Sequence, residues 1–305
     1  MKKGMIQALL ILGIIALPLM AGAAGTVVFL EDFEHADYVL GAELPSSPTV
    51  AAAGGIPASG KIWEGFNWQA DGSDWVEGVD FLASEVFTSN SLISGGGDKA
   101  LEICDDVTTK ITDPAPGSET QIYEMTGMDQ DVINGIVEFD YRYVGIWDDD
   151  PALHTHFVAF FPQEPGLPGG LNSGTDGVNK KAALFVQIYQ KKDGGTPAGK
   201  GMRFRVAGAS WFAVPGVTIE DNTDYHIKST FSCVARTSIV EVSHGVTIDY
   251  TGEVLLPSET AVPDMVVDGL EIVPWKATTS HFQIDNIKLT DLGTSTEADE
   301  VWKLY

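Results

Sequence analysis

Hydrophobic and polar side chains alternate with a period of two along the second half of the chain. From 137 to 143, the odd positions are apolar or aromatic, and the even positions between them are charged. Related alternation recurs in 182–190, 201–207 and 225–233, and a further strand is predicted at 155–161. Strands with one apolar and one polar face are typical of antiparallel sheets that pack on one side. The pattern therefore predicts an all-β sandwich of two stacked antiparallel sheets.

The rest of the chain fits the same architecture. No stretch of ten or more residues beyond the first 24 shows the period of an amphipathic helix. The 33 glycines and 15 prolines are spread throughout, as expected for many short strands. Neither an internal repeat nor a linker divides the sequence, so we predict one domain over 25–293 and a C-terminal tail over 294–305. Long surface loops are predicted at 40–60 and 167–180.

The first 24 residues have the pattern of a secretory signal peptide. Two lysines follow the initial methionine, a nearly unbroken apolar segment covers 5–20, and small residues at 21–24 provide a cleavage site. The alternative is a membrane anchor, but the apolar segment is short for a span and no charged flank follows it. We expect a secreted, extracellular or cell-surface protein, with the periplasm as the alternative, and no membrane insertion after cleavage.

Charge and cysteine content narrow the picture further. Cleavage would remove two of the 18 basic residues and none of the 43 acidic ones, which changes the net charge from −25 to −27. Such a surface repels phosphate backbones, so nucleic acid is not expected as a partner, and bound cations are favoured. The two cysteines, Cys104 and Cys233, favour a disulfide in an oxidising compartment; two separate buried thiols are the alternative.

Three short motifs carry a family resemblance that spans nearly the whole mature chain. The segment 27–34 ends in Asp-Phe-Glu, the segment 97–103 has a G-x-x-A-L pattern, and the segment 281–290 contains Ile-Asp-Asn-Ile. Together they resemble the opening, early and closing strands of the concanavalin A-like lectin/glucanase superfamily. The resemblance implies a jelly roll in which the opening and closing strands, from opposite ends of the chain, are neighbours.

The closing segment breaks its own alternation. Phe282 and Ile284 share one parity, whereas Ile287 and Leu289 share the other. One extra residue near Asp285 would return all four to the same face, which is the effect of a β-bulge. The alternative is a strand that is buried on both faces and needs no bulge.

The resemblance also implies a structural calcium ion where the chain ends meet. Members of this superfamily often hold such an ion with the closing-strand aspartate and nearby backbone carbonyls, and calcium prefers six to eight oxygen ligands. Here that aspartate is Asp285, with Glu31, Asp32 or Glu34 as further ligands. An aspartate that only caps the bulge is the alternative.

Two enzyme classes of this superfamily were compared with the chain. Catalytic glucanases carry an E-x-D-x-x-E strand that pairs a nucleophile with a proton donor. Glu138 and Asp140 supply the first two positions, but Tyr143 occupies the third, which argues against retaining glycoside hydrolysis. The segment 187–189 is similar to the Q-I-H strand of jelly-roll alginate lyases, with Tyr189 in place of the histidine.

A lyase activity stays open as an alternative. Tyr189 could move a proton while Arg203 or Arg205 neutralises the carboxylate of a uronate. A weaker sign of metal chemistry is the pair His154 and His156 after an acidic run at 148–150, since an H-x-H pair on a strand can place both imidazoles on one face. No third ligand follows at a recognisable spacing, and a polar loop leading into a strand is the alternative.

Aromatic residues favour a binding protein over an enzyme. Flat rings beside carboxylates and amides suit sugar rings, whose apolar faces stack while their hydroxyls form hydrogen bonds. Trp63, Trp68 and Trp75 lie in an Asn-, Asp- and Gly-rich stretch, and Trp147 and Trp211 lie at strand ends. The alternative is that these tryptophans close the ends of the core.

The polar faces of the predicted strands supply the candidate ligand contacts. If those strands are neighbours in one sheet, their polar side chains converge on a single surface; if they lie in different sheets, the side chains pair with neighbours instead. Arginine forks suit carboxylate or sulfate groups. The candidates are Glu138, Asp140, Arg142, Gln187, Tyr189, Arg203 and Arg205, with His226 and Lys228 on the corresponding faces.

From these features we predict a secreted, lectin-like and non-catalytic protein that binds a polysaccharide or glycan, preferably an acidic one. The alternatives are a jelly-roll polysaccharide-degrading enzyme, either alginate-lyase-like or a glycoside hydrolase, and a structural surface or matrix protein without a small ligand.

Overall fold

The computed structural model describes fifteen separate parts of the chain between Gly25 and Gly293. They are 25–34, 36, 38–41, 63–68, 74–76, 86–97, 99–104, 120–125, 131–144, 155–161, 183–193, 196–207, 210–256, 266–275 and 281–293. The predicted signal peptide, the C-terminal tail, the loop at 167–180 and nearly all of the loop at 40–60 lie outside these residues. Within them the regular secondary structure is β-strand, and no helix long and apolar enough to span a membrane occurs there.

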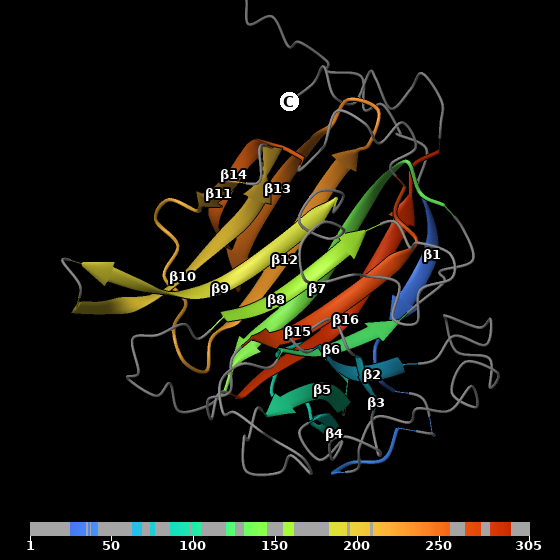
Figure 1. Ribbon diagram of the computed structural model, residues 1–305, viewed down its shortest axis with the longest axis vertical. Helices are drawn as coiled ribbons and strands as arrows, with labels where there is room; N and C mark the ends of the chain where they lie inside the picture. The colour runs from blue at the N-terminus through green and yellow to red at the C-terminus, as the bar shows by residue number, and fades with distance from the viewer. Residues whose placement is uncertain are drawn as a thin grey trace, which may run out of the picture.

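Two eight-stranded sheets contain the sixteen strands of the described residues, and every strand pair among them is antiparallel (Figure 1). In sheet A the order is β14 (Thr247–Leu255), β13 (Thr237–His244), β12 (Asp224–Ser232), β7 (Asn134–Tyr143), β16 (His281–Asp291), β5 (Lys99–Cys104) and β4 (Val86–Asn90), with β1 (Thr26–Glu31) also paired to β16. In sheet B the order is β11 (Ser210–Ala213), β10 (Thr196–Val206), β9 (Leu184–Asp193), β8 (Thr155–Phe161), β15 (Gly269–Trp275), β6 (Thr120–Met125), β2 (Trp63–Trp68) and β3 (Asp74–Val76).

The sheets stack through the apolar faces that alternation predicts. On β7, each odd position from Val137 to Tyr143 is buried, whereas the charged positions between them are only partly buried. Phe139 of sheet A stacks on Phe160 of sheet B, with ring centres 6.4 Å apart. The prediction of two stacked antiparallel sheets is confirmed, because the inward faces of both sheets form one hydrophobic core.

The two ends of the domain meet at β16. Strand β1, drawn in blue, pairs with the second half of the red strand β16, and β5 pairs with the first half on the same side (Figure 1). The predicted neighbourhood of the opening and closing strands is therefore confirmed. Strand β7 covers the other side of β16 along most of its length.

The predicted bulge in β16 is also confirmed. The register against β7 shifts between Asp285 and Lys288, and Asn286 adopts a left-handed backbone with φ of 52°. A left-handed conformation is several-fold commoner for asparagine than for most other residues with a side chain. The apolar residues on both sides of the bulge are fully buried in the same core: Phe282, Ile284, Ile287 and Leu289.

The predicted disulfide between Cys104 and Cys233 is wrong. Cys233 is a buried free thiol, and burial raises its pKa to about 12. Cys104 lies opposite the first residue of β16, whereas Cys233 follows the end of β12, which aligns with the last residues of β16. Two strands separate β5 from β12, so the sideways distance alone is roughly 14 Å. A disulfide needs Cα atoms within about 7 Å.

Candidate functional site

The structure divides the predicted polar surface between the two sheets. Strands β7 and β12 belong to sheet A, whereas β9 and β10 belong to sheet B. The outer faces of two stacked sheets point away from each other, so the candidates cannot meet on one surface. Convergence on a single surface is therefore a wrong prediction. The sheet A group comprises Glu138, Asp140, Arg142, His226 and Lys228, and the sheet B group comprises Gln187, Tyr189, Arg203 and Arg205.

The sheet B group forms a compact cluster with one additional aromatic residue. The guanidinium carbon of Arg203 lies 4.8 Å from the centre of the Tyr189 ring and 4.3 Å from the centre of the Trp211 ring. The guanidinium carbon of Arg205 lies 4.8 Å from the same Trp211 ring. Arg203 Nε also donates to the side-chain oxygen of Gln187. We call these five residues the arginine–tryptophan face.

Strand register explains how the cluster forms. Arg203 lies opposite Gln187 across the β9–β10 pair, and Arg205 lies opposite Trp211 across the β10–β11 hairpin. Opposite residues in an antiparallel pair have Cβ atoms about 5 Å apart, within reach of long side chains. Trp211 was predicted only to lie at a strand end, and the structure places it on this face. Arg205 and Trp211 each lie three residues from Gly208. A hairpin turn centred on that glycine would have predicted that they lie opposite each other.

The arginine–tryptophan face has an uncompensated positive charge. Neither guanidinium forms an ion pair with a carboxylate in the described part of the chain, and Arg205 Nε is buried there without a hydrogen-bond partner. Burial lowers the pKa of both arginines. The positive charge of Arg205 lowers the pKa of Arg203 further. Adjacent unpaired cations are unexpected in a chain with 43 acidic and 18 basic residues, and they are suited to an external anion.

The sheet A group is an internally paired network. His226 Nδ1 lies 2.7 Å from Asp140 Oδ1, and its Nε2 lies 3.5 Å from Glu138 Oε2. Glu138 also pairs with Lys288. Hydrogen bonds to Asp140 and then Glu138 raise the pKa of His226 to about 9, and the bond from His226 is the main cause that lowers the pKa of Glu138 to about 2.

The remaining sheet A candidates fit the same picture. Arg142 Nη1 lies 2.9 Å from Asp224 Oδ1, and the same nitrogen donates to the backbone oxygen of Leu92. The E-x-D pair of the glucanase comparison is thus engaged by histidine, lysine and asparagine partners, since Asn286 also donates to Asp140 over 2.9 Å. This face is neutralised by its own residues, in contrast to the arginine–tryptophan face.

The predicted calcium ligands lie where β1, β5 and β16 meet. Asp285 is fully buried, and its carboxylate accepts hydrogen bonds from its neighbour Asn286 N over 2.7 Å and from Ser91 Oγ over 3.2 Å. A Cβ on Gly96 would overlap the Asp285 carboxylate, and one on Gly97 would overlap Glu34. The early glycine loop therefore packs directly against two acidic side chains.

The charge state of this junction reflects its burial. Burial is the main cause that raises the pKa of Asp285 to about 7, and nearby Asp140 and Glu34 add to the effect. Burial likewise raises the pKa of Glu31 to about 7, against the hydrogen bond that it accepts from Tyr38 over 2.7 Å. Asp32 instead accepts a hydrogen bond from Glu34 N over 3.1 Å. Within the described ranges, no three acidic, histidine or cysteine side chains are arranged to hold a metal by themselves. An ion here would need backbone carbonyls or water as additional ligands, and the all-oxygen donor set fits calcium.

The side chains of several aromatic and histidine candidates lie outside the described part of the structure. Trp147, His154 and the acidic run at 148–150 lie outside the described residues. Trp63, Trp68, Trp75 and His156 lie in β2, β3 and β8, and only the backbone of these four residues is described.

Comparison with known proteins gives distant structural likenesses only. No family model matches the sequence, and no curated protein matches it. An alginate lyase of family PL-14 from Aplysia kurodai is 11% identical with a TM-score of 0.45, covering 81% of this chain and 96% of its own. A carbohydrate esterase, vb_24B_21 from the Shiga toxin-encoding bacteriophage phi24B, is 13% identical with a TM-score of 0.44, covering 88% and 99%.

A third solved structure is the acidic lectin of winged bean, complexed with methyl-α-D-galactose. It is 14% identical with a TM-score of 0.42, covering 75% of this chain and 98% of its own. The solved structures similar to this chain thus include a lectin, an alginate lyase and a carbohydrate esterase. All three likenesses lie below 25% identity and below a TM-score of 0.5, so they carry no conclusion about what this chain binds.

Proposed function

We propose that this chain is an exported, non-catalytic carbohydrate-binding protein whose ligand is an acidic polysaccharide. The ligand lies across the arginine–tryptophan face on the outside of sheet B. Export is supported by the signal-like sequence at 1–24, and the binding face is supported by the geometry of Arg203, Arg205 and Trp211.

The observation that carries this proposal is that neither arginine has a carboxylate partner among the residues that the structure describes. Both lie against one tryptophan ring, and no described acid neutralises either of them. Two adjacent cations repel each other, so an anionic ligand relieves a cost that the protein bears in its free state. Planar guanidinium groups bind carboxylate and sulfate groups through two parallel hydrogen bonds. A uronate or sulfated sugar supplies such a group on each charged ring.

The aromatic residues complete a site for sugar rings. Tyr189 and Trp211 both contact the guanidinium of Arg203, which reduces the side-chain freedom that Arg203 loses when it binds a ligand. Gln187, only 3% exposed, fixes the same side chain through its hydrogen bond. Preorganised polar groups and aromatic surface are the features of a sugar-binding face.

The overall charge of the protein limits which acidic glycans bind well. After signal cleavage the net charge is −27, so the acidic surface around the face repels those parts of a long polyanion that come within the screening length, which is about 8 Å at physiological salt. Short oligosaccharides that fit entirely on the face avoid this repulsion. We therefore expect short acidic oligosaccharides to bind more tightly than long chains when salt is low.

A lyase of the same site is the second candidate, because Tyr189 contacts Arg203 directly. In a lyase, the arginine would neutralise a uronate carboxylate while the phenol moves a proton. Product analysis separates the two functions. A lyase releases products with unsaturated ends, which absorb ultraviolet light. A binding protein leaves the oligosaccharide chemically unchanged.

The test of the proposed function is calorimetric titration with short oligouronates, with neutral oligosaccharides of equal length for comparison. The double variant Arg203→Ala with Arg205→Ala should lose binding and keep its fold. A matched control removes two cations elsewhere, through Lys228→Ala on sheet A and Arg236→Asn in a turn where the left-handed backbone accepts asparagine. Retained binding in the double variant, or equal affinity for neutral sugars, would reject the site.

We also propose that a structural calcium ion binds at the junction of the chain ends, with Asp285 as its central ligand and Glu34 beside it. The buried carboxylate with a raised pKa supports this, since a divalent cation would stabilise its charged form. Calcium would link β1, the glycine loop and β16 and so hold both ends of the domain together.

A further inference from the structure

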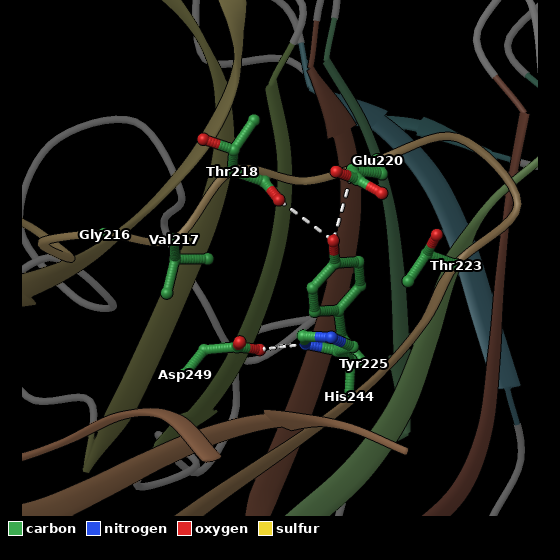
Figure 2. A pocket seen from close by; sticks show the side chains of 8 residues that line it. All are labelled: Gly216, Val217, Thr218, Glu220, Thr223, Tyr225, His244 and Asp249. Carbon is green, nitrogen blue, oxygen red and sulfur yellow. Dashed lines mark hydrogen bonds and ion pairs between the residues drawn. The ribbon is translucent and has the colours of Figure 1, made fainter. Parts of the chain in front are cut away.

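A polar pocket lies at the edge of the sandwich, where the loop 214–223 meets β12, β13 and β14 (Figure 2). Its volume is about 190 Å³, room for roughly six water molecules. It is separate from the arginine–tryptophan face and shares no residue with it. The lining side chains that matter here are Thr218, Glu220, Thr223, Tyr225, His244 and Asp249.

On β13, a polar residue occupies the position at which the row of buried core side chains would otherwise continue. Val240 and Val242 of β13 are fully buried, and His244 holds the next position of the same parity. The register between β13 and β14 shifts after Val242, because Tyr250 lies opposite Val242 while Ile248 lies opposite Ser243. Asp249 is therefore the extra residue of a bulge, a feature that re-aims a side chain.

The re-aimed carboxylate binds the histidine. Asp249 Oδ2 lies 2.6 Å from His244 Nδ1, and Figure 2 shows the two side chains meeting at one end of the pocket. This contact orients the imidazole ring, and Nε2 of His244 has no partner among the described residues.

Tyr225 holds the opposite side of the pocket in place. Its hydroxyl donates to the backbone oxygen of Thr218 over 2.9 Å and accepts from Glu220 N over 3.0 Å, as the dashed lines in Figure 2 show. Its ring centre lies 6.1 Å from that of His244. The hydroxyl thus uses its single donor and one of its acceptor positions to fix the loop.

The groups left to contact a ligand are mainly acceptors. The carboxylate of Glu220 and the second oxygen of Asp249 accept hydrogen bonds, and no described lysine or arginine lines the pocket. An ammonium group has three donors and no acceptor, and aromatic rings attract it further. No three described side chains are arranged to hold a metal ion there, which leaves an organic cation as the complementary ligand.

We propose that this edge pocket binds a small organic ammonium ion, with the amino group of an amino sugar as the type of ligand. The free oxygen of Asp249 accepts from its N–H groups at the His244 end of the pocket, and the Glu220 carboxylate and Thr223 contact the adjoining hydroxyls. The proposal rests on the pocket alone and does not depend on the function proposed for the arginine–tryptophan face.

The experiment is a titration of the full-length mature chain with glucosamine, with N-acetylglucosamine and glucose as neutral analogues of nearly the same shape. We expect saturable binding of one glucosamine per chain and at least tenfold weaker binding of both analogues. Glu220→Gln and Asp249→Asn should each weaken glucosamine binding about tenfold. Glu253→Gln, which removes an exposed carboxylate from the same strand β14, is the matched control and should change nothing.

A second measurement covers the case in which a pocket variant does not fold. In the unmodified protein, glucosamine should shift the nuclear magnetic resonance signals of the His244 ring, assigned by their loss in His244→Gln. Absence of that shift overturns the proposal. Equal binding of glucosamine and N-acetylglucosamine also overturns it, because the recognised group would then not be an ammonium. Loss of binding in the Glu253→Gln control would show a diffuse attraction to the acidic surface, which contradicts a pocket.

Discussion

His226 and Asp140 face each other across β12 and β7, with Nδ1 of the histidine 2.7 Å from Oδ1 of the aspartate. The pairing raises the pKa of His226 to about 9, from an ordinary value near 6.5. A histidine whose pKa is raised on folding stabilises the protein fully below its unfolded pKa, and this contribution is lost as the pH rises through the folded pKa.

The first prediction follows from that sign. His226→Gln should lower the free energy of unfolding by about 1 kcal/mol at pH 6, a modest value because the side chain is 39% exposed and screened by solvent. The difference from the unmodified protein should shrink between pH 7 and pH 9 and vanish near pH 10. Urea denaturation at these pH values measures it. A deficit that stays constant up to pH 10 would mean that packing, and not charge, explains the loss.

The second prediction concerns the geometry of the arginine–tryptophan face. Arg203→Lys keeps the positive charge but loses the planar fork that contacts both Tyr189 and Trp211. Affinity for short oligouronates should fall about tenfold, with little change in melting temperature. Calorimetric titration gives the affinity. If lysine binds as well as arginine, charge alone attracts the glycan and the ring contacts are incidental.

The third prediction tests the proposed calcium ion through the sign of its effect. Without a metal, Asp285 has a pKa raised to about 7, so its contribution to stability is present below pH 4 and is lost as the pH rises through 7. In chelator at pH 8, Asp285→Asn should therefore melt at the same or a higher temperature than the unmodified protein. Excess calcium should raise the melting temperature of the unmodified protein and leave that of the variant unchanged.

The control for the calcium test is Asp131→Asn, which removes an exposed carboxylate outside the junction. It should respond to calcium like the unmodified protein. Calcium should also stabilise the protein more at pH 8 than at pH 5, because protons compete for the carboxylate at the lower pH. An unmodified protein whose melting temperature is the same in chelator and in excess calcium has no such site.

The fourth prediction concerns Cys233. With Cys104 replaced by alanine, the remaining thiol should not react with Ellman's reagent at pH 8 until the protein unfolds, because it is buried and its pKa is raised to about 12. The same replacement should not cost the roughly 3 kcal/mol or more that losing a disulfide around so long a loop would cost. Rapid reaction in the folded state would show that Cys233 is accessible.

Local parity in the sequence predicted much of the fold. The change of parity between Ile284 and Ile287 predicted a bulge, and the structure has one, with Asn286 in the left-handed conformation. The charged positions of β7 and β10 were assigned correctly to non-core faces. Both successes depend on one strand at a time, since the period of two assigns each side chain to a face wherever the strand is placed.

Features that depend on how strands pair with one another were not predicted from the period of two. The disulfide prediction failed because nothing in the spacing of Cys104 and Cys233 shows that two strands lie between them. The edge pocket was not predicted, because His244 and Asp249 come into contact only through a bulge in the β13–β14 hairpin.

The sequence by itself thus determined that the chain forms antiparallel strands and which face of each strand is apolar. It also determined that the motifs near its two ends lie on neighbouring strands. Only the tertiary structure decided which sheet each strand enters. That choice separated Glu138 and Asp140 from Arg203 and Arg205, left the acids paired with His226, and left the arginines without a carboxylate partner among the described residues. The physical reason is that the side-chain period is a property of the local backbone. Strand order, in contrast, depends on which apolar faces can be buried together, and that is settled by the whole chain at once.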